Sequence, residues 1–82
     1  MTIELLQGQF SPMEAINLLS GFIQIRIKHH EQQIVQASNE EDIKSRESQI
    51  KNLQHELTKL KNEIISMREP IKITSALKIE HI

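Results

Sequence analysis

Four histidines are the residues in this chain that come closest to a set of metal ligands. His29 and His30 are adjacent, and neighbouring side chains on a helix point about 100° apart, so the two do not face one ion together. His55 and His81 lie far from them along the chain. No pair has the i, i+4 spacing of a helical metal site, and no His-x-x-x-Glu or Glu-x-x-His run accompanies them. The sequence therefore predicts no metal ligand and no metal cofactor.

Acidic and hydroxyl side chains give no sign of catalysis either. Glu40, Glu41 and Asp42 cluster at the expected start of a helix, where the helix dipole favours acids. Ser11 and Ser38 stand in helix-capping positions rather than in a nucleophile elbow. The chain also has no cysteine and no glycine-rich phosphate loop. We expect a protein that is not an enzyme, with no catalytic residue and no cofactor.

A modest basic patch indicates a second kind of chemistry, the binding of nucleic acid. The patch consists of Arg26, Lys28, His29, His30, Lys44, Arg46 and Lys51. It is diluted by Glu31, Glu40, Glu41, Asp42 and Glu47. The formal net charge of the chain is -1, and Phe10 and Phe22 are its only aromatic residues, so neither a strong positive field nor a stacking platform is present. A small dimeric nucleic-acid-binding regulator that uses this patch is the alternative function.

The strongest pattern in the chain is a heptad repeat, which predicts a helix that packs against another helix. Its members are Ile43, Arg46, Ile50, Leu53, Leu57, Leu60, Ile64 and Met67. They alternate in steps of three and four, and seven of the eight are apolar. The residues between them are almost all polar, so the apolar seam is narrow and the rest of the helix faces water.

Capping signals give the bounds of two helices. Ser11 and Glu14 form a capping box with proline at the first helical position, which predicts a helix over 12–36. Ser38 and Glu41 form a second capping box, which predicts a helix over 39–69. Proline follows that second helix and disfavours helical geometry in the residue before it.

A short connection makes two helices antiparallel neighbours. The residues of the first helix that would face the heptad can therefore be checked for apolar character. With this pairing, each apolar member of the heptad lies opposite or beside an apolar residue. The hairpin seam so defined is Ile16, Ile23, Ile27, Ile34, Ile43, Ile50, Leu53, Leu57, Leu60, Ile64 and Met67. Arg46 falls opposite His30 and Glu31; we expect its side chain to be solvated, with Glu31 as the alternative partner. A parallel coiled coil and a domain-swapped dimer fit the same heptad, but the tethered helix has the higher effective concentration.

A second apolar stripe lies on the first helix beside this seam. We call it the apolar stripe, and it consists of Ala15, Leu18, Leu19, Phe22 and Ile25. Monomers rarely leave such a patch exposed. A second copy covers it in a dimeric four-helix bundle with Gly21 near the crossing; a helix of another protein or the chain's own ends are the other candidates. A homodimer is favoured because symmetric homodimers are the commonest oligomers.

The two ends of the chain are expected to be short extensions, over 1–10 and 70–82. Apolar and polar residues alternate over 71–79, and less regularly near the N-terminus, which is typical of strands. Both ends lie at the same end of the hairpin, so their pairing as a ribbon is a hypothesis, and a frayed tail is the equally weighted alternative.

These patterns predict an all-α fold over a single domain, 1–82. Its architecture is an antiparallel, coiled-coil-like two-helix hairpin with short β-like terminal extensions, assembled as a dimeric four-helix bundle. We expect a small adaptor, regulatory or accessory protein that binds protein partners through the apolar stripe. No stretch is long and apolar enough to span a bilayer, and the first residues lack the basic start of a signal peptide. A cytoplasmic protein without a membrane partner is therefore expected.

Overall fold

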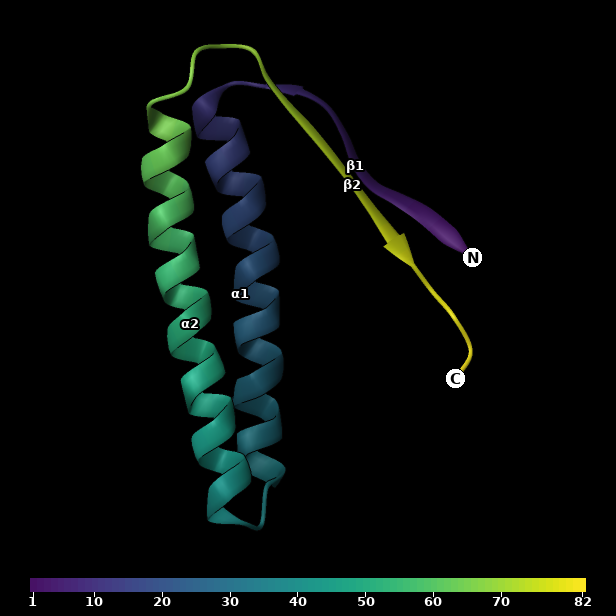
Figure 1. Ribbon diagram of the computed structural model, residues 1–82, viewed down its shortest axis with the longest axis vertical. Helices are drawn as coiled ribbons and strands as arrows, with labels where there is room; N and C mark the ends of the chain where they lie inside the picture. The colour runs from purple at the N-terminus through teal and green to yellow at the C-terminus, as the bar shows by residue number, and fades with distance from the viewer.

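The computed structural model describes all 82 residues and contains two long helices and a two-stranded antiparallel sheet (Figure 1). The order along the chain is β1 (Thr2–Phe10), α1 (Pro12–Gln36), α2 (Glu40–Ile65) and β2 (Ile71–Lys78). The all-α fold class expected from the sequence is wrong, because the two terminal extensions form strands that pair with each other. The chain is an α+β protein that combines a helical hairpin with a β-ribbon made of β1 and β2.

The start of α1 is held by a reciprocal pair of side-chain hydrogen bonds. Ser11 Oγ accepts a hydrogen bond from the backbone N–H of Glu14 at 3.2 Å, and Glu14 Oε1 accepts one from the N–H of Ser11 at 3.2 Å. Pro12 occupies the first turn, where its missing N–H is not needed. The capping box predicted at this position is confirmed.

The start of α2 differs by one residue from the expectation. Asn39, rather than Ser38, caps the helix, and its Oδ1 accepts a hydrogen bond from the backbone N–H of Asp42 at 2.7 Å. The predicted capping box of Ser38 with Glu41 is therefore wrong. Asparagine is among the best N-cap residues, so it takes over this position from the neighbouring serine.

The end of α2 comes earlier than proline alone indicates. The helix ends at Ile65, whereas the sequence predicts that it continues over 66–69. Ser66 Oγ donates a hydrogen bond to the carbonyl oxygen of Glu63 at 2.7 Å, and the backbone N–H of Met67 bonds to the carbonyl of Ile64 at 3.0 Å. These local bonds compete with the helical pattern and close the last turn.

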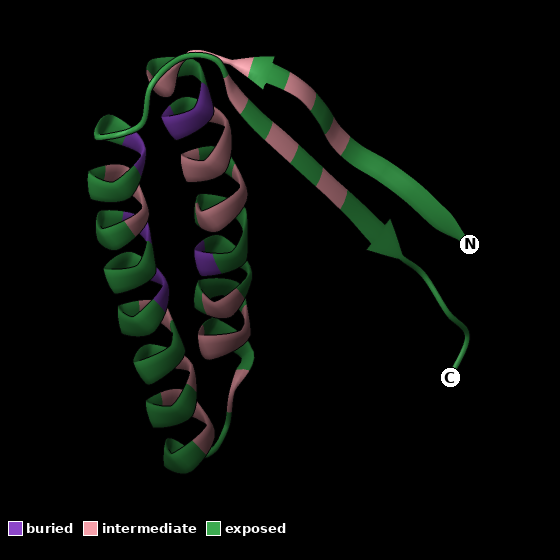
Figure 2. Ribbon diagram, turned by 45° about the horizontal axis from the view of Figure 1, so that its top comes forward, coloured by how far each residue is buried: buried purple, intermediate pink, exposed green.

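The two helices lie side by side and antiparallel, joined by a short turn over 37–39 (Figure 1). Their facing sides hold most of the buried residues of the protein, coloured purple in Figure 2. These are Ile16 and Ile27 of α1 and Leu53, Leu57 and Ile64 of α2. The heptad therefore predicts the hairpin packing correctly.

The two strands pair antiparallel along their whole length. The ladder runs from the Phe10–Ile71 pair beside the helices to the Thr2–Lys78 pair near the termini. Its register shifts once, between Glu4 and Leu6 of β1. The structure thus decides between the two alternatives that the sequence left open, since the ends form a ribbon and not a frayed tail.

The register shift makes Leu5 an extra residue in β1, that is, a β-bulge. A bulge changes the phase of the alternating side chains by one position. Ile3 and Leu6, three residues apart, therefore lie on the same face of the ribbon. This shift explains why the alternation near the N-terminus is irregular in the sequence.

The hairpin and the ribbon form a single layer. The Cα atoms extend over 47 × 32 × 13 Å, and the shortest extent is little more than one helix diameter. The ribbon leaves the end of the hairpin where α1 begins and α2 ends, and then diverges from the helices (Figures 1 and 2). Domains normally bury a core between two packed layers. Here only six of 82 residues are buried, so the core of one chain is small.

Candidate association surface

The end of the apolar stripe near the start of α1 is covered by the chain's own ribbon. Ala15 has no exposed area (0%) and forms a small core with Ile16 and Ile64. The half-buried apolar residues packed against this core are Phe10, Leu19, Leu60, Ile71 and Ile73. Ala15 is therefore not available to a partner, and its expected role in partner binding is wrong. The capping residues reveal where the helix begins, but not the direction in which the ribbon leaves it.

The rest of the apolar stripe becomes more open with distance from the ribbon base. Leu18, Leu19 and Phe22 are half-buried, whereas Ile25 is 67% exposed. Gly21 lies among them on α1, and no atom lies within 4 Å of the position that a Cβ would take there. This part of α1 therefore presents an accessible apolar surface with open space beside its glycine.

The ribbon has one apolar face and one polar face. The bulge and the pairing register place Ile3, Leu6, Gly8, Phe10, Ile71, Ile73, Ser75 and Leu77 on the first face. The polar face carries Thr2, Glu4, Gln7, Gln9, Lys72, Thr74, Ala76 and Lys78. Gly8 leaves room on the first face for the ring of Phe10, because a Cβ at this position would lie only 3.3 Å from that ring. We call the first set the apolar ribbon face.

The apolar ribbon face is covered only at its base. Ile71 and Ile73 pack against the core around Ala15. Near the termini, Ile3 is 44% exposed and Leu77 46% exposed. The ribbon therefore carries apolar side chains away from the hairpin into solvent.

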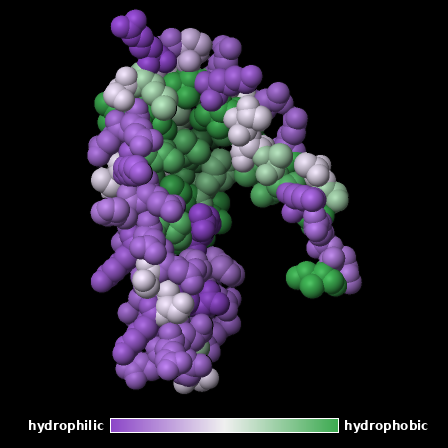
Figure 3. All heavy atoms as spheres, viewed as in Figure 1, coloured by the Kyte–Doolittle hydropathy of each residue, from purple (hydrophilic) through white to green (hydrophobic).

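The stripe and the ribbon together form one continuous apolar region. Figure 3 shows hydrophobic atoms gathered over the half of the hairpin near the ribbon and continuing onto the ribbon, whereas the half near the turn is hydrophilic. The open part of this region contains Leu18, Phe22 and Ile25 of α1 with Ile3 and Leu77 of the ribbon. We call these five residues the association surface. The sequence predicts its three helical residues but not the two of the ribbon. The bulge interrupts the strand pattern around Ile3, and Leu77 lies in an alternating segment that the sequence does not assign to the surface.

Most of the predicted hairpin seam lies between the helices. Ile16, Ile27, Leu53, Leu57 and Ile64 are buried, and Ile23, Ile34, Ile43, Ile50 and Leu60 are half-buried. Met67 is the exception, since it lies beyond the end of α2 and is 49% exposed. The early end of α2 at Ile65 removes Met67 from the seam.

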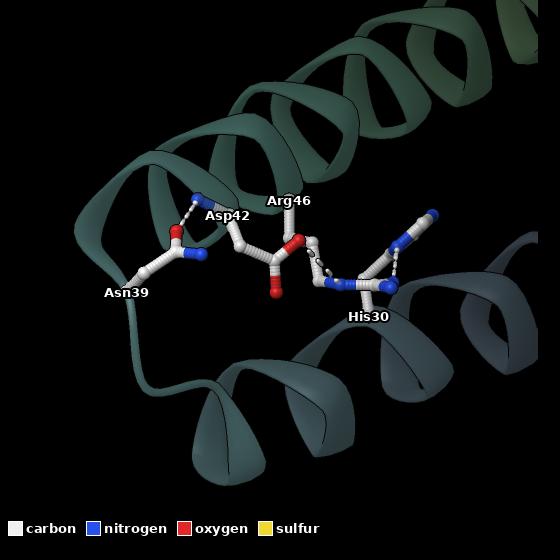
Figure 4. A network of polar contacts seen from close by, with 4 residues as sticks. All are labelled: His30, Asn39, Asp42 and Arg46. Atoms are coloured by element: carbon white, nitrogen blue, oxygen red, sulfur yellow. Dashed lines mark hydrogen bonds and ion pairs between the residues drawn. The ribbon is translucent and has the colours of Figure 1, made fainter.

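A polar network closes the hairpin near its turn (Figure 4). The guanidinium of Arg46 lies 3.1 Å from His30 Nδ1 and 3.7 Å from Asp42 Oδ1. Its Nε atom is buried and has no hydrogen-bond partner. The expectation of a solvated Arg46, with Glu31 as the alternative partner, is therefore wrong. The side chain is held by a histidine of α1 and an aspartate of its own helix.

His30 is the group whose titration this network changes. Desolvation lowers the pKa of His30 below its ordinary value, and the positive charges of Arg46, His29 and Arg26 lower it further. His30 is thus held neutral in the folded chain near physiological pH. The neutral imidazole of His30 accepts a hydrogen bond from Arg46 at Nδ1 and so links α1 to α2. No substrate-sized cavity adjoins it.

The basic patch around the turn is partly neutralised within the chain. Arg46 is paired with Asp42, and Lys44 Nζ lies 4.0 Å from Glu40 Oε1. Both pairs link residues one turn apart on α2. Pairing of this kind reduces the positive field that a phosphate backbone would meet.

Pockets and metal-ligand clusters give no second site. The pocket of the structure is a shallow depression of about 270 Å³ on α2, lined by Glu56, Lys59, Leu60 and Glu63. No group of three or more His, Cys, Asp or Glu side chains is arranged to hold a metal ion. The association surface is therefore the candidate functional site of this chain.

No protein-family model matches this chain, and no match was found among curated proteins or solved structures. Neither helix is long and apolar enough to cross a membrane.

Proposed function

We propose that this protein is a non-enzymatic association module that works as a homodimer, with the association surface buried between the two copies. In this role it serves as a small adaptor, regulatory or accessory protein of the cytoplasm. The proposal departs from a dimer of helices alone, because the ribbon contributes two of the five residues of the surface.

The observation that carries this proposal is the large accessible area of the single chain. The chain exposes 6679 Å², whereas a compact monomer of its mass exposes about 5,050 Å². Its radius of gyration is 15.5 Å, against about 11.7 Å for a compact domain of its length. An excess of about 1,600 Å² per chain supports a partner that buries much of it.

A second copy fits this excess better than a small or transient partner. Two chains together carry an excess of about 3,200 Å², which lies in the range that obligate homodimers bury. A net charge of -1 leaves little repulsion between copies. The association surface itself contains no charged residue, as the centre of such an interface requires.

The test is the solution mass of the wild type and of two glutamate variants, measured by light scattering on a sizing column. Phe22→Glu places a charge inside the association surface and should give a folded monomer. Gln32→Glu adds the same charge at an exposed position of α1, closer to the turn, and should remain a dimer. Circular dichroism checks that both variants stay helical.

A second measurement covers the case in which Phe22→Glu does not fold. The unfolding midpoint of a wild-type homodimer should rise with protein concentration, because association stabilises only the folded chain. A wild type that is monomeric at micromolar concentration, with a midpoint independent of concentration, would overturn the proposal.

A further inference from the structure

The two edges of the ribbon are not equivalent. A two-stranded sheet leaves one row of backbone groups unpaired on each strand. On β1 this row is interrupted by the bulge at Leu5, whereas β2 contains no extra residue. The pairing of β2 continues one step past the strand, since Ile79 exchanges backbone hydrogen bonds of 2.8 and 3.0 Å with Met1. The edge of β2 is therefore regular over its full length.

The Met1–Ile79 pair defines which backbone groups of β2 are free. In an antiparallel ladder, alternate residues direct both their N–H and C=O groups to the same neighbouring strand. Ile79 points to β1, so the outward groups belong to Lys72, Thr74, Ala76 and Lys78. Their side chains lie on the polar face of the ribbon.

We propose that β2 pairs antiparallel with β2 of a second copy about a two-fold axis through Ala76, giving a four-stranded sheet across the dimer. This inference rests on the homodimer proposed above and specifies how its ribbons meet. A two-fold axis normal to the sheet keeps both apolar ribbon faces on the same side. Both hairpins then lie on that side, so edge pairing and burial of the association surface occur in one dimer.

Charge complementarity selects the register centred on Ala76. In this register Lys72 of each copy lies opposite Glu80 of the other, and Ile73 lies opposite Ile79 on the apolar face. Lys72 makes no ion pair within its own chain. Glu80 bonds to Lys78 at 2.7 Å on the exposed polar face, which leaves its second oxygen free for a cross-strand partner.

The neighbouring two-fold registers are less favourable. Centring the pair on Ser75 places Lys72 opposite Lys78 twice, and like charges directly opposite each other are destabilising. Centring it on Leu77 places Ile73 of the apolar face opposite His81. A register shifted by a single residue would set the apolar face of one ribbon against the polar face of the other.

Single cysteines test the pairing, because the natural chain has none. Directly opposed residues of a hydrogen-bonded pair have Cα atoms about 5.5 Å apart, within the range of a disulfide. Ala76→Cys should therefore cross-link to a covalent dimer under mild oxidation. Gln7→Cys, on the same polar face but on the outer strand, would lie about 20 Å from its copy, three strand spacings across the sheet and four residues along it, and should cross-link at least about tenfold more slowly.

A charge exchange tests the register independently. Lys72→Glu should weaken the dimer about tenfold at low salt. The variant places a glutamate opposite Glu80 of the other copy, and the two-fold axis repeats this like-charge pair. Combining Lys72→Glu with Glu80→Lys should restore most of the lost affinity.

The outcomes separate this inference from the proposed homodimer. A dimeric wild type in which Ala76→Cys cross-links no faster than Gln7→Cys overturns the edge pairing and leaves the homodimer standing. Retained affinity in Lys72→Glu overturns the register centred on Ala76. A monomeric wild type overturns both proposals.

Discussion

The guanidinium of Arg46 on α2 donates a hydrogen bond to His30 Nδ1 on α1 across 3.1 Å. Arginine has only donors, so Nδ1 must be the acceptor and the imidazole must be neutral. Desolvation and then the charge of Arg46 keep the pKa of His30 below its ordinary value. The hairpin is thus joined near its turn by a bond that acid breaks.

This bond makes stability depend on pH. Below about pH 6.5 the unfolded chain binds a proton at His30 that the folded chain resists, so the free energy of unfolding should fall as the pH falls. His30→Asn keeps an acceptor for Arg46 and removes the titration. Urea unfolding at fixed protein concentration, at about pH 7.5 and 5, should show that the free energy of unfolding changes less with pH in the variant than in the wild type. Parallel curves for the two proteins would contradict the role of His30.

The junction of hairpin and ribbon depends on Ile64. Its side chain is buried with Ala15 and Ile16 where the ribbon begins, so Ile64→Ala should lower the free energy of unfolding by about 2–4 kcal/mol. Ile65→Ala removes the same atoms from a neighbour that is largely exposed, and should cost less than about 1 kcal/mol. Chemical unfolding of both variants measures the difference. Equal losses would show that the cluster does not hold the junction.

Ser20 carries a buried hydroxyl with no hydrogen-bond partner. Removing an unsatisfied buried polar group removes its desolvation cost, so Ser20→Ala should raise the free energy of unfolding by about 1 kcal/mol beyond the gain in helix propensity. Ser48→Ala, at an exposed site of α2, measures the propensity gain alone. A smaller gain for Ser20→Ala than for Ser48→Ala would indicate that the hydroxyl is satisfied in solution.

The alternative of nucleic-acid binding predicts salt-dependent retention on immobilised DNA. We expect no retention even at low salt, because two cations of the patch are paired and the net charge is -1. The triple change of Lys28, Lys44 and Lys51 to glutamine is the control. Retention by the wild type that disappears in this variant would favour the alternative.

The helical part of the fold is largely predictable from sequence, because its signals are local. The capping box at Ser11 and the heptad around Leu53 and Leu57 each report on residues within one or two turns. Small displacements at the ends of α2 arise where neighbours compete, as Asn39 does with Ser38 and as Ser66 does with the helical pattern.

The ribbon part of the candidate site is harder to predict, because the signal of its first strand is interrupted. Leu5 breaks the alternation between Ile3 and Leu6, so the N-terminal strand lacks a clear period. The burial of Ala15 depends on the direction in which the ribbon leaves the hairpin. That direction is set by packing of Ile71 and Ile73 on the cluster, which no local pattern encodes.

The bulge at Leu5 has a consequence for how far assembly proceeds. A ribbon with two regular edges would accept another ribbon on each side and polymerise into a fibre without end. Because the bulge makes the outer edge of β1 irregular, each ribbon has one regular edge, that of β2. When two β2 edges pair, only the irregular β1 edges remain on the outside of the sheet. In the homodimer that we propose, one additional leucine would thus act as a chain terminator that limits the assembly to two copies.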